Sequence, residues 1–189
     1  NLKVGKVRRK SIDETYELVV GKVSTARNHC NEMVVPLQEK VSPGRLINLV
    51  VRAFNDGIAF RYEFPEQEGW NSYVMYDEKT QFRLSGNPMA LLMYLPGYIN
   101  THEGVYTHTG YDKIAKKRLI EMPVTLEFEN GVFMSITEAA IRDYAGMYLV
   151  KEKDAFAGKL SPRLGQEKIK VEINEFPHRT PWRVISVSD

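Results

Sequence analysis

Cysteine and long apolar runs are scarce in this sequence. Cys30 is the only cysteine among the 189 residues, so no internal disulfide can form. The cysteine count therefore does not distinguish a reducing cellular compartment from an oxidising one. The longest apolar run, residues 89–95, is far shorter than the ~18 residues that suggest a membrane-spanning helix, so we expect no membrane span. The motifs GxxxxGK(S/T), GxGxxG and GxSxG are also missing, which argues against the usual phosphate-binding loops and against a serine nucleophile elbow.

An excess of one charge is lacking as well. The chain has 26 Lys and Arg residues against 24 Asp and Glu residues, a formal net charge of +2. This balance gives no support for binding to nucleic acid or to an acidic membrane surface. Hydrophobic residues make up 43% and charged residues 26%, a globular composition that argues against disorder, collagen and a simple coiled coil. The length suits one domain or two small ones.

Two predicted β-hairpins dominate the pattern. Residues 50–64 alternate apolar and polar side chains after the turn at Asn55-Asp56-Gly57, and residues 125–137 repeat the design around Asn130-Gly131. Weaker strands are predicted at residues 15–23, 33–37, 146–151, 169–173 and 183–187.

Helical patterns are few. We expect at most a turn or two of helix within residues 111–119, and a short helix that starts within residues 137–144. The sequence therefore predicts an all-β fold, and an antiparallel sandwich is favoured over a closed barrel.

One polar stretch, Arg27-Asn28-His29-Cys30-Asn31-Glu32, gathers six functional side chains between predicted strands. Adjacent residues on an extended chain point to opposite faces, which disfavours a Cys30–His29 nucleophile pair. Two interpretations stay open on these residues alone. One is a polar loop that hydrogen-bonds a hydroxyl-rich ligand, and the other is a loop whose Asn side chains satisfy its own backbone.

Glu138 follows directly after a predicted hairpin strand, among small residues. A carboxylate at the end of a rigid strand is well placed to act as a ligand or a base. The competing interpretation, favoured on these residues alone, is a glutamate in the first turn of a helix or a pair with Arg142. Asp143 has the same two interpretations.

His102 and His108 would share a face on a strand, with Glu103 between them. A zinc site needs three or four convergent ligands, and no further His or Cys lies near at a metal-binding spacing, so a polar loop is favoured. The carboxylates of the chain form no evident catalytic pair.

Five stretches together resemble glycoside hydrolase family 97. They are RNHCNE at residues 27–32, FNDGIAFRY at 54–62, HEGVY at 102–106, SITEAAIRDYAGMYL at 135–149 and TPWRVI at 180–185. Three positions depart from the family pattern, since Cys30 and His102 replace tyrosines and Ala145 replaces a proline. The stretches occur in the family's order and span about Asp13 to Asp189.

The resemblance implies a β-super-sandwich similar to the galactose-mutarotase fold. In the family this N-terminal domain precedes a catalytic (β/α)8 barrel and a small C-terminal β domain. Residues 1–189 would then be part of the N-terminal domain, incomplete at its N-terminal side, with the barrel starting beyond Asp189. Family members are α-glucosidases and α-galactosidases, exported to the periplasm and active with a calcium ion.

The resemblance also assigns roles to residues. Glu138, the glutamate of the ITEA motif, would be a calcium ligand. Four residues of the polar stretch would line the substrate cleft: Arg27, Asn28, His29 and Glu32. The catalytic carboxylates lie on the barrel in the family, so we expect no catalytic residue here. Since Ca²⁺ takes about 6–8 oxygen ligands, the isolated chain would bind calcium feebly and be inactive. The expected partners are an α-glucoside or α-galactoside substrate and the enzyme's own barrel.

Two other functions are open to this sequence. A free-standing carbohydrate-binding sandwich could stack sugar rings on Trp70, Tyr73 and Tyr76, although packing in the core is the favoured role of these aromatic residues. A mutarotase-like epimerase would need a histidine and a carboxylate on either side of a sugar. His29 and Glu138 could be proposed, but nothing in the sequence supports that pairing.

Overall fold

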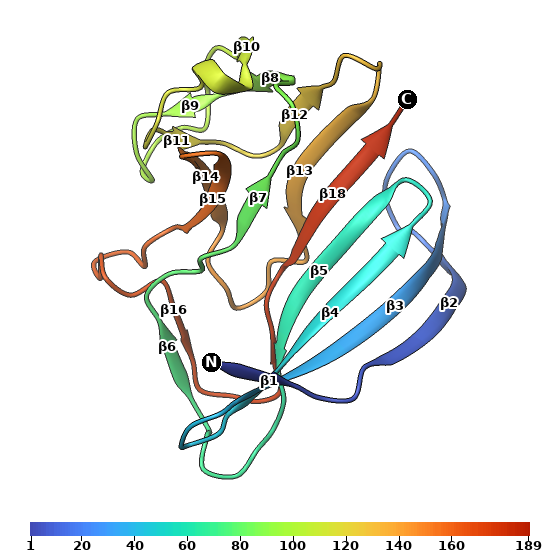
Figure 1. Ribbon diagram of the computed structural model, residues 1–189, viewed down its shortest axis with the longest axis vertical. Helices are drawn as coiled ribbons and strands as arrows, with labels where there is room; N and C mark the ends of the chain where they lie inside the picture. The colour runs from blue at the N-terminus through green and yellow to red at the C-terminus, as the bar shows by residue number, and fades with distance from the viewer.

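The computed structural model describes every residue from Asn1 to Asp189, and it is built almost entirely from antiparallel strands (Figure 1). The largest sheet contains β1 (Leu2–Val4), β2 (Arg8–Glu17), β3 (Thr25–Glu39), β4 (Leu46–Phe54), β5 (Gly57–Phe64), β8 (Met89–Leu92), β10 (Thr107–Gly110), β12 (Val124–Glu127), β13 (Phe133–Ala139), β17 (His178–Arg179) and β18 (Trp182–Ser188). A second sheet contains β7 (Gln81–Arg83), β9 (Tyr94–Leu95), β11 (Leu119–Ile120), β14 (Met147–Glu152) and β15 (Ala155–Leu160). A small third sheet pairs β6 (Tyr73–Met75) with β16 (Val171–Ile173).

The strand order joins segments that are far apart in the sequence. The 11-stranded sheet has the order β1-β3-β4-β5-β18-β13-β12-β8-β10, with β2 paired to β3 and β17 paired to β5. The 5-stranded sheet has the order β7-β15-β14-β11-β9. In Figure 1 the strands β2–β5, β18 and β13 lie side by side, and β14, β15 and β7 face them across the molecule. The all-β antiparallel sandwich predicted from the sequence is confirmed.

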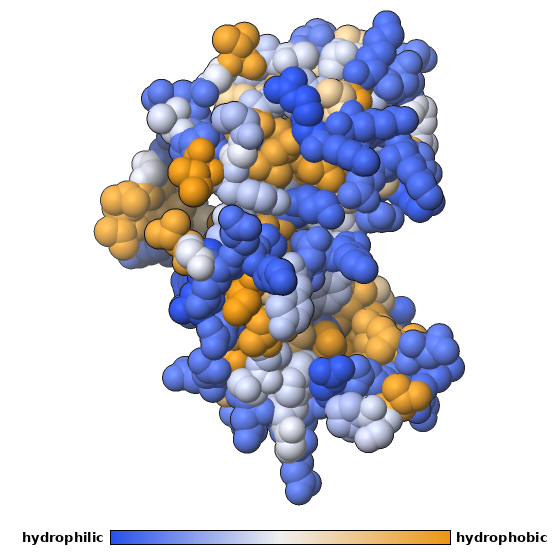
Figure 2. Space-filling model, turned by 90° about the vertical axis from the view of Figure 1, so that its left-hand side faces the viewer, coloured by the Kyte–Doolittle hydropathy of each residue, from blue (hydrophilic) through white to orange (hydrophobic).

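The main hydrophobic core lies between the two larger sheets. Leu126 and Ile136 enter it from the 11-stranded sheet, and Leu149 and Phe156 enter it from the 5-stranded sheet, all four with no exposed surface. Complete burial of such a side chain stabilises the fold by about 1.5–3 kcal/mol, so this contact holds the two sheets together. On the face shown in Figure 2, apolar side chains form several separate patches between hydrophilic ones.

Both predicted hairpins are confirmed. β4 and β5 pair up to Phe54 and Gly57, and β12 and β13 pair up to Glu127 and Phe133. Gly57 also lies against β18, because a Cβ atom at this position would come within 2.3 Å of the carbonyl oxygen of Ile185. Glycine at this turn therefore permits the close approach of β5 and β18.

The weaker strands are present with different bounds. β14, β16 and β18 correspond to the predicted strands at 146–151, 169–173 and 183–187. The predicted strand at 15–23 ends at Glu17, and residues 33–37 belong to the much longer β3. The polar stretch at 27–32 is not a loop, because it lies within β3 and pairs with β2 along its whole length.

The two helical expectations have different outcomes. Within residues 111–119 a single 3-10 turn forms, η1 (Tyr111–Lys113), in agreement with the expected turn or two. The expected helix within residues 137–144 is absent, because β13 continues to Ala139 by pairing with β18. Ala140 and Asp143 then have φ values of 57° and 49°, a left-handed conformation that interrupts a right-handed helix. No helix in the structure has the length and apolar character needed to cross a membrane.

Candidate functional site

Glu138 belongs to a network of buried charged side chains that also contains Arg183 and Glu78. Arg183 lies on β18, and its side chain has no exposed surface. Its Nε donates to Oε1 of Glu78 at 2.9 Å and its Nη2 donates to Oε2 of Glu78 at 2.6 Å, a bidentate pair. Its Nη1 donates to Oε2 of Glu138 on the neighbouring strand β13. One guanidinium thus joins two carboxylates inside the domain.

Glu78 is fixed by further donors. The Thr80 hydroxyl donates to its Oε1 at 2.7 Å, and the Tyr144 hydroxyl donates to its Oε2 at 2.9 Å. Burial acts to raise the pKa of Glu78, but the hydrogen bonds from Arg183, Thr80 and Tyr144 outweigh it and hold the pKa below its usual value. Glu78 is therefore a stable anion in the interior.

Glu138 has a different environment. Its Oε1 accepts a hydrogen bond from the backbone N–H of Met147 at 3.0 Å, and its side chain keeps about one tenth of its surface exposed, 10%. Burial raises the pKa of the Glu138 carboxyl, and the Met147 N–H and Arg183 offset only part of this effect. The predicted pair with Arg142 is wrong, since the partner is Arg183.

The geometry of Glu138 suits one ligand of a cation, and no more. Each carboxylate oxygen has a second lone pair that can accept a metal in addition to the hydrogen bond it already receives. No group of three or more His, Cys, Asp or Glu side chains in the chain could hold a metal ion. Since calcium takes about 6–8 oxygen ligands, most ligands of a calcium ion at Glu138 would come from outside this domain.

An aromatic cluster packs beside the network. The ring of Tyr144 stacks on His178, with centroids 6.0 Å apart and planes 18° apart. Nδ1 of His178 lies 2.7 Å from the Tyr73 hydroxyl, and its Nε2 is buried without a hydrogen-bond partner. Burial lowers the pKa of His178, although the nearby Asp143 opposes the shift. Tyr73 also stacks on Phe64 at 4.6 Å, so Tyr73 is a packing residue.

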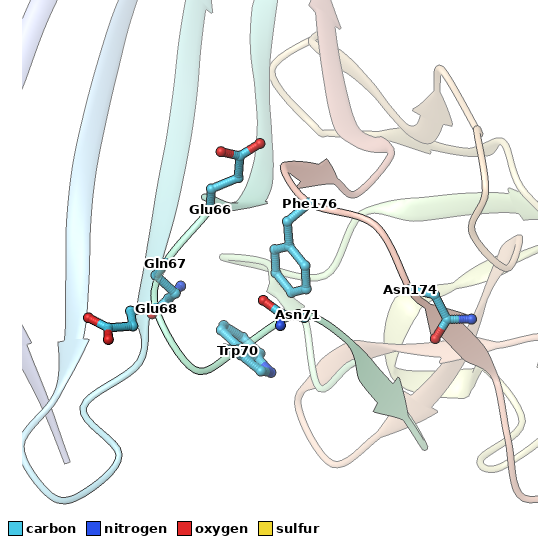
Figure 3. Close-up of a pocket in the computed structure, with 7 residues that line it drawn as sticks. All are labelled: Glu66, Gln67, Glu68, Trp70, Asn71, Asn174 and Phe176. Atoms are coloured by element: carbon cyan, nitrogen blue, oxygen red, sulfur yellow. The ribbon is translucent and has the colours of Figure 1, made fainter.

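A surface cleft of about 550 Å3 lies next to this cluster, between the segments that follow β5 and β16 (Figure 3). Its lining residues are Glu66, Gln67, Glu68, Trp70, Asn71, Asn174 and Phe176. The Trp70 ring lies 5.3 Å from the ring of Phe176, and the Arg45 guanidinium lies 5.2 Å from the Trp70 centroid. Tyr76 is exposed but does not line the cleft, so the three predicted aromatic residues form no common platform.

The four predicted cleft-lining residues lie on β3, where the register divides them. Asn28 and Glu32 point to one face of the sheet, and Arg27 and His29 point to the other. Arg27 forms a bidentate pair with Asp13 of β2, with both N–O distances 2.7 Å. Following the register through β4, β5 and β18, only Arg27 and His29 share the face that carries Glu138.

Residues from three of the family-like stretches meet on the opposite face. Glu32 is buried and accepts a hydrogen bond from Arg52 at 2.9 Å. The guanidinium groups of Arg52 and Arg61 lie 4.8 Å and 4.3 Å from the ring centroid of Trp182. No local pattern in the sequence points to this cluster, because its members are brought together only by sheet register.

The cysteine and the two histidines do not form a reactive site. Cys30 is buried, and this burial raises the pKa of its thiol. Nδ1 of His102 lies 2.6 Å from Oε2 of Glu121, and Nε2 of His108 lies 3.9 Å from Oε2 of Glu127. Each histidine therefore lies beside its own glutamate, and His108 lies on strand β10 rather than in a loop.

Comparison with known proteins assigns the domain. The family model described as "Glycosyl-hydrolase 97 N-terminal" matches residues 1–189. A curated relative from Bacteroides thetaiotaomicron, named retaining alpha-galactosidase, is 24% identical over 214 residues, which cover 100% of this chain and 31% of the relative. The chain therefore spans about a third of the length of this relative.

Solved structures agree. A variant of a glycoside hydrolase family 97 enzyme from Pseudoalteromonas sp. strain K8 matches with a TM-score of 0.88 and 29% identity, over 99% of this chain and 28% of that one. Another variant of that enzyme, in complex with panose, matches with a TM-score of 0.86 and 30% identity over the same shares.

The fold and these matches define a domain of the glycoside hydrolases. More narrowly, the chain belongs to the glycosyl-hydrolase 97 N-terminal family. The family and the galactose-mutarotase-like sandwich predicted from the sequence are thereby confirmed.

Proposed function

We propose that this domain packs on the catalytic barrel of a family 97 α-glycosidase and supplies Glu138 to the calcium ion of its active site. The observation that carries the proposal is the state of Glu138. Arg183 and the Met147 N–H fix its carboxylate, yet a tenth of the side chain remains exposed. Metal ligands are typically oriented in this way by surrounding hydrogen bonds.

A bound calcium ion would polarise the substrate and help to orient it. The residues of this domain contribute a negative charge at Glu138 and hold that charge at the end of a rigid strand. The carboxylates that act as acid and as base or nucleophile would lie on the barrel, so this domain performs no proton transfer and no bond cleavage. Alone it would be inactive.

An α-glucoside or an α-galactoside is the proposed substrate class. The name of the curated relative supports a galactoside, and the panose complex of the other relative supports a glucoside. The near-neutral charge of this chain is compatible with a neutral sugar, which needs no electrostatic steering. Cleft lining by Arg27, Asn28, His29 and Glu32, and a periplasmic location, are further parts of this proposal and rest on the family resemblance. Of the four residues, Arg27 and His29 are the ones on the sheet face that carries Glu138.

The test is Glu138→Gln in the complete enzyme. This substitution keeps the shape of the side chain and removes its charge, so calcium affinity and turnover of an aryl α-glycoside should fall together. Glu129→Gln is the matched control, because Glu129 is exposed in the turn before β13 and forms no side-chain hydrogen bond or ion pair. Unchanged calcium affinity in the Glu138 variant would remove this residue from the calcium site.

A second candidate is a carbohydrate-binding domain that acts without a barrel. The cleft beside Trp70 is the observation in its favour, because an aromatic ring next to free Asn side chains suits a neutral sugar. Isothermal titration calorimetry of the 189-residue chain with a neutral α-glucan oligosaccharide tests it. Saturable binding that is lost in Trp70→Ala would support this second function, and the absence of binding heat would rule it out for this ligand.

A further inference from the structure

We infer that Arg183 and Glu78 are positioning residues that set the orientation and the charge of Glu138 for the calcium ion. This inference rests on the proposed function of Glu138. Neither residue reaches the exposed part of the network, since Arg183 has no exposed side-chain surface and Glu78 has 6%. They act on a metal only through Glu138.

The orientation follows from how Arg183 is held. A guanidinium is planar, so two parallel hydrogen bonds to Glu78 fix its plane as well as its position. The remaining Nη1 group then points in one direction, and Oε2 of Glu138 accepts from it. The Met147 N–H donates to the other oxygen, Oε1, so both oxygens of the Glu138 carboxylate are held by hydrogen bonds.

Glu78 is held in turn by Thr80, two residues further along the same segment, and by Tyr144 from the turn after β13. The hydroxyls of Thr80 and Tyr144 donate to its two oxygens. The centroid of the Tyr144 ring lies 6.0 Å from that of His178 and 5.8 Å from the guanidinium carbon of Arg183. The orientation of Glu138 therefore depends on a chain of contacts that begins at Tyr144, in the turn between β13 and β14.

The charge follows from how Arg183 is shared. One guanidinium serves two carboxylates, so the trio carries a net charge of one negative unit when both acids are ionised. Arg183 gives two hydrogen bonds to Glu78 and one to Glu138. Without the anion at Glu78, the cation of Arg183 would pair with Glu138 alone and neutralise it. Glu78 thus leaves Glu138 with negative charge for a cation.

The experiment measures calcium affinity by isothermal titration calorimetry in the complete enzyme, for Glu138→Gln, Arg183→Lys and Glu78→Gln. Arg183→Lys keeps the charge but cannot bridge the two carboxylates, and Glu78→Gln keeps the shape but releases Arg183 to Glu138. Substitution of residues that orient a metal ligand typically weakens metal binding about 10- to 100-fold, and we expect this loss in both variants. Arg179→Lys is the control, because Arg179 is exposed and its only ion pair is with Glu63 at 3.3 Å.

The outcomes separate the two claims. If Glu138→Gln weakens calcium binding while Arg183→Lys and Glu78→Gln bind as the wild type does, the proposed function stands and the positioning roles are wrong. If Arg183→Lys binds normally but Glu78→Gln does not, charge alone matters and the orienting role of Arg183 is wrong. If Glu138→Gln itself binds normally, both claims fail together.

A milder variant covers the case in which the buried substitutions prevent folding. Tyr144→Phe removes only the hydroxyl that donates to Glu78 and leaves the stacked ring in place. We expect several-fold weaker calcium binding with an unchanged circular dichroism spectrum. Wild-type affinity in a folded Tyr144→Phe protein would overturn the chain of contacts that begins at Tyr144.

Discussion

Arg183 and Glu78 form a bidentate ion pair inside the domain, although 105 residues separate them in the sequence. The two N–O distances are 2.9 Å and 2.6 Å, and the Glu78 side chain is only 6% exposed. A buried pair of this kind gives little net stability compared with apolar residues, but loss of one partner leaves the other charge without compensation. The domain therefore depends on both residues being present.

Arg183→Met should lower the free energy of unfolding of the 189-residue chain by about 3–5 kcal/mol, because it leaves Glu78 and Glu138 as uncompensated buried carboxylates. Urea denaturation followed by circular dichroism measures this. Arg27→Met removes the exposed pair with Asp13 and should leave the unfolding free energy close to the wild-type value. Equal effects of the two substitutions would contradict the importance of the buried network.

Gly57→Ala should destabilise the chain by about 1–3 kcal/mol, because the added Cβ would lie 2.3 Å from the carbonyl oxygen of Ile185 and must push β5 and β18 apart. Thermal and urea denaturation both report the change. Gly97→Ala is the matched control, since no atom lies within 4 Å of a Cβ built there. A Gly57 variant as stable as the control would show that the two strands can separate without loss.

The stability of the chain should decrease as the pH falls below about 6.5, the usual pKa of histidine, partly because of His178. Burial lowers the pKa of folded His178, so below the unfolded pKa the unfolded state binds a proton that the folded state does not. The contribution of His178 is present above that pH and is lost towards its lowered folded pKa. His178→Gln should reduce the difference in unfolding free energy between about pH 7 and about pH 5.

His108→Gln is the control for this measurement, because His108 is exposed and lies 3.9 Å from Glu127, which is also exposed. An identical pH dependence of the His178 variant and the wild type would show that His178 titrates as freely when folded as when unfolded.

The isolated 189-residue chain should bind calcium too weakly for saturation in a calorimetric titration. Glu138 is the only carboxylate proposed as a ligand, and no group of three or more His, Cys, Asp or Glu side chains in the chain could hold a metal ion. The complete enzyme serves as the positive control. Tight, stoichiometric binding by the isolated chain would show that the ligands of the ion come from this domain.

Local signals predict both hairpins and the approximate places of β14, β16 and β18, but not which strands pair across the sheet. Asn55-Asp56-Gly57 and Asn130-Gly131 specify tight turns through their own backbone preferences, so the pairs β4–β5 and β12–β13 could be read from the sequence. The pairing of β5 with β18 brings Ile58 opposite Ile185, a contact between distant segments that no local pattern encodes. The polar stretch at 27–32 resembles a loop in the sequence, because the cross-strand ion pairs that stabilise a polar strand can be recognised only when the partner strand is known.

The candidate site shows the same limit. Glu138 could be named from its motif, but its partner could not, because Arg183 pairs with it only through the register of β13 and β18. The sequence does contain one signal. Arg183, Ile185 and Val187 are spaced two residues apart on β18, so the charged Arg183 shares a face of the strand with two apolar residues. Such a position requires a buried acid, but the identity of Glu78, in a segment without regular structure, came only from the structure.

The position of β18 has a consequence for the order in which the domain can assemble. β18 lies between β5 and β13, yet it comes after every other strand in the chain. During synthesis from the N-terminus, β1–β5 and the β12–β13 hairpin must wait as two separate pieces with an open edge each, until residues 182–188 emerge and close the gap between them. Non-local closure of this kind slows folding, so the half-made domain presents unpaired strand edges that a chaperone or a neighbouring chain could occupy.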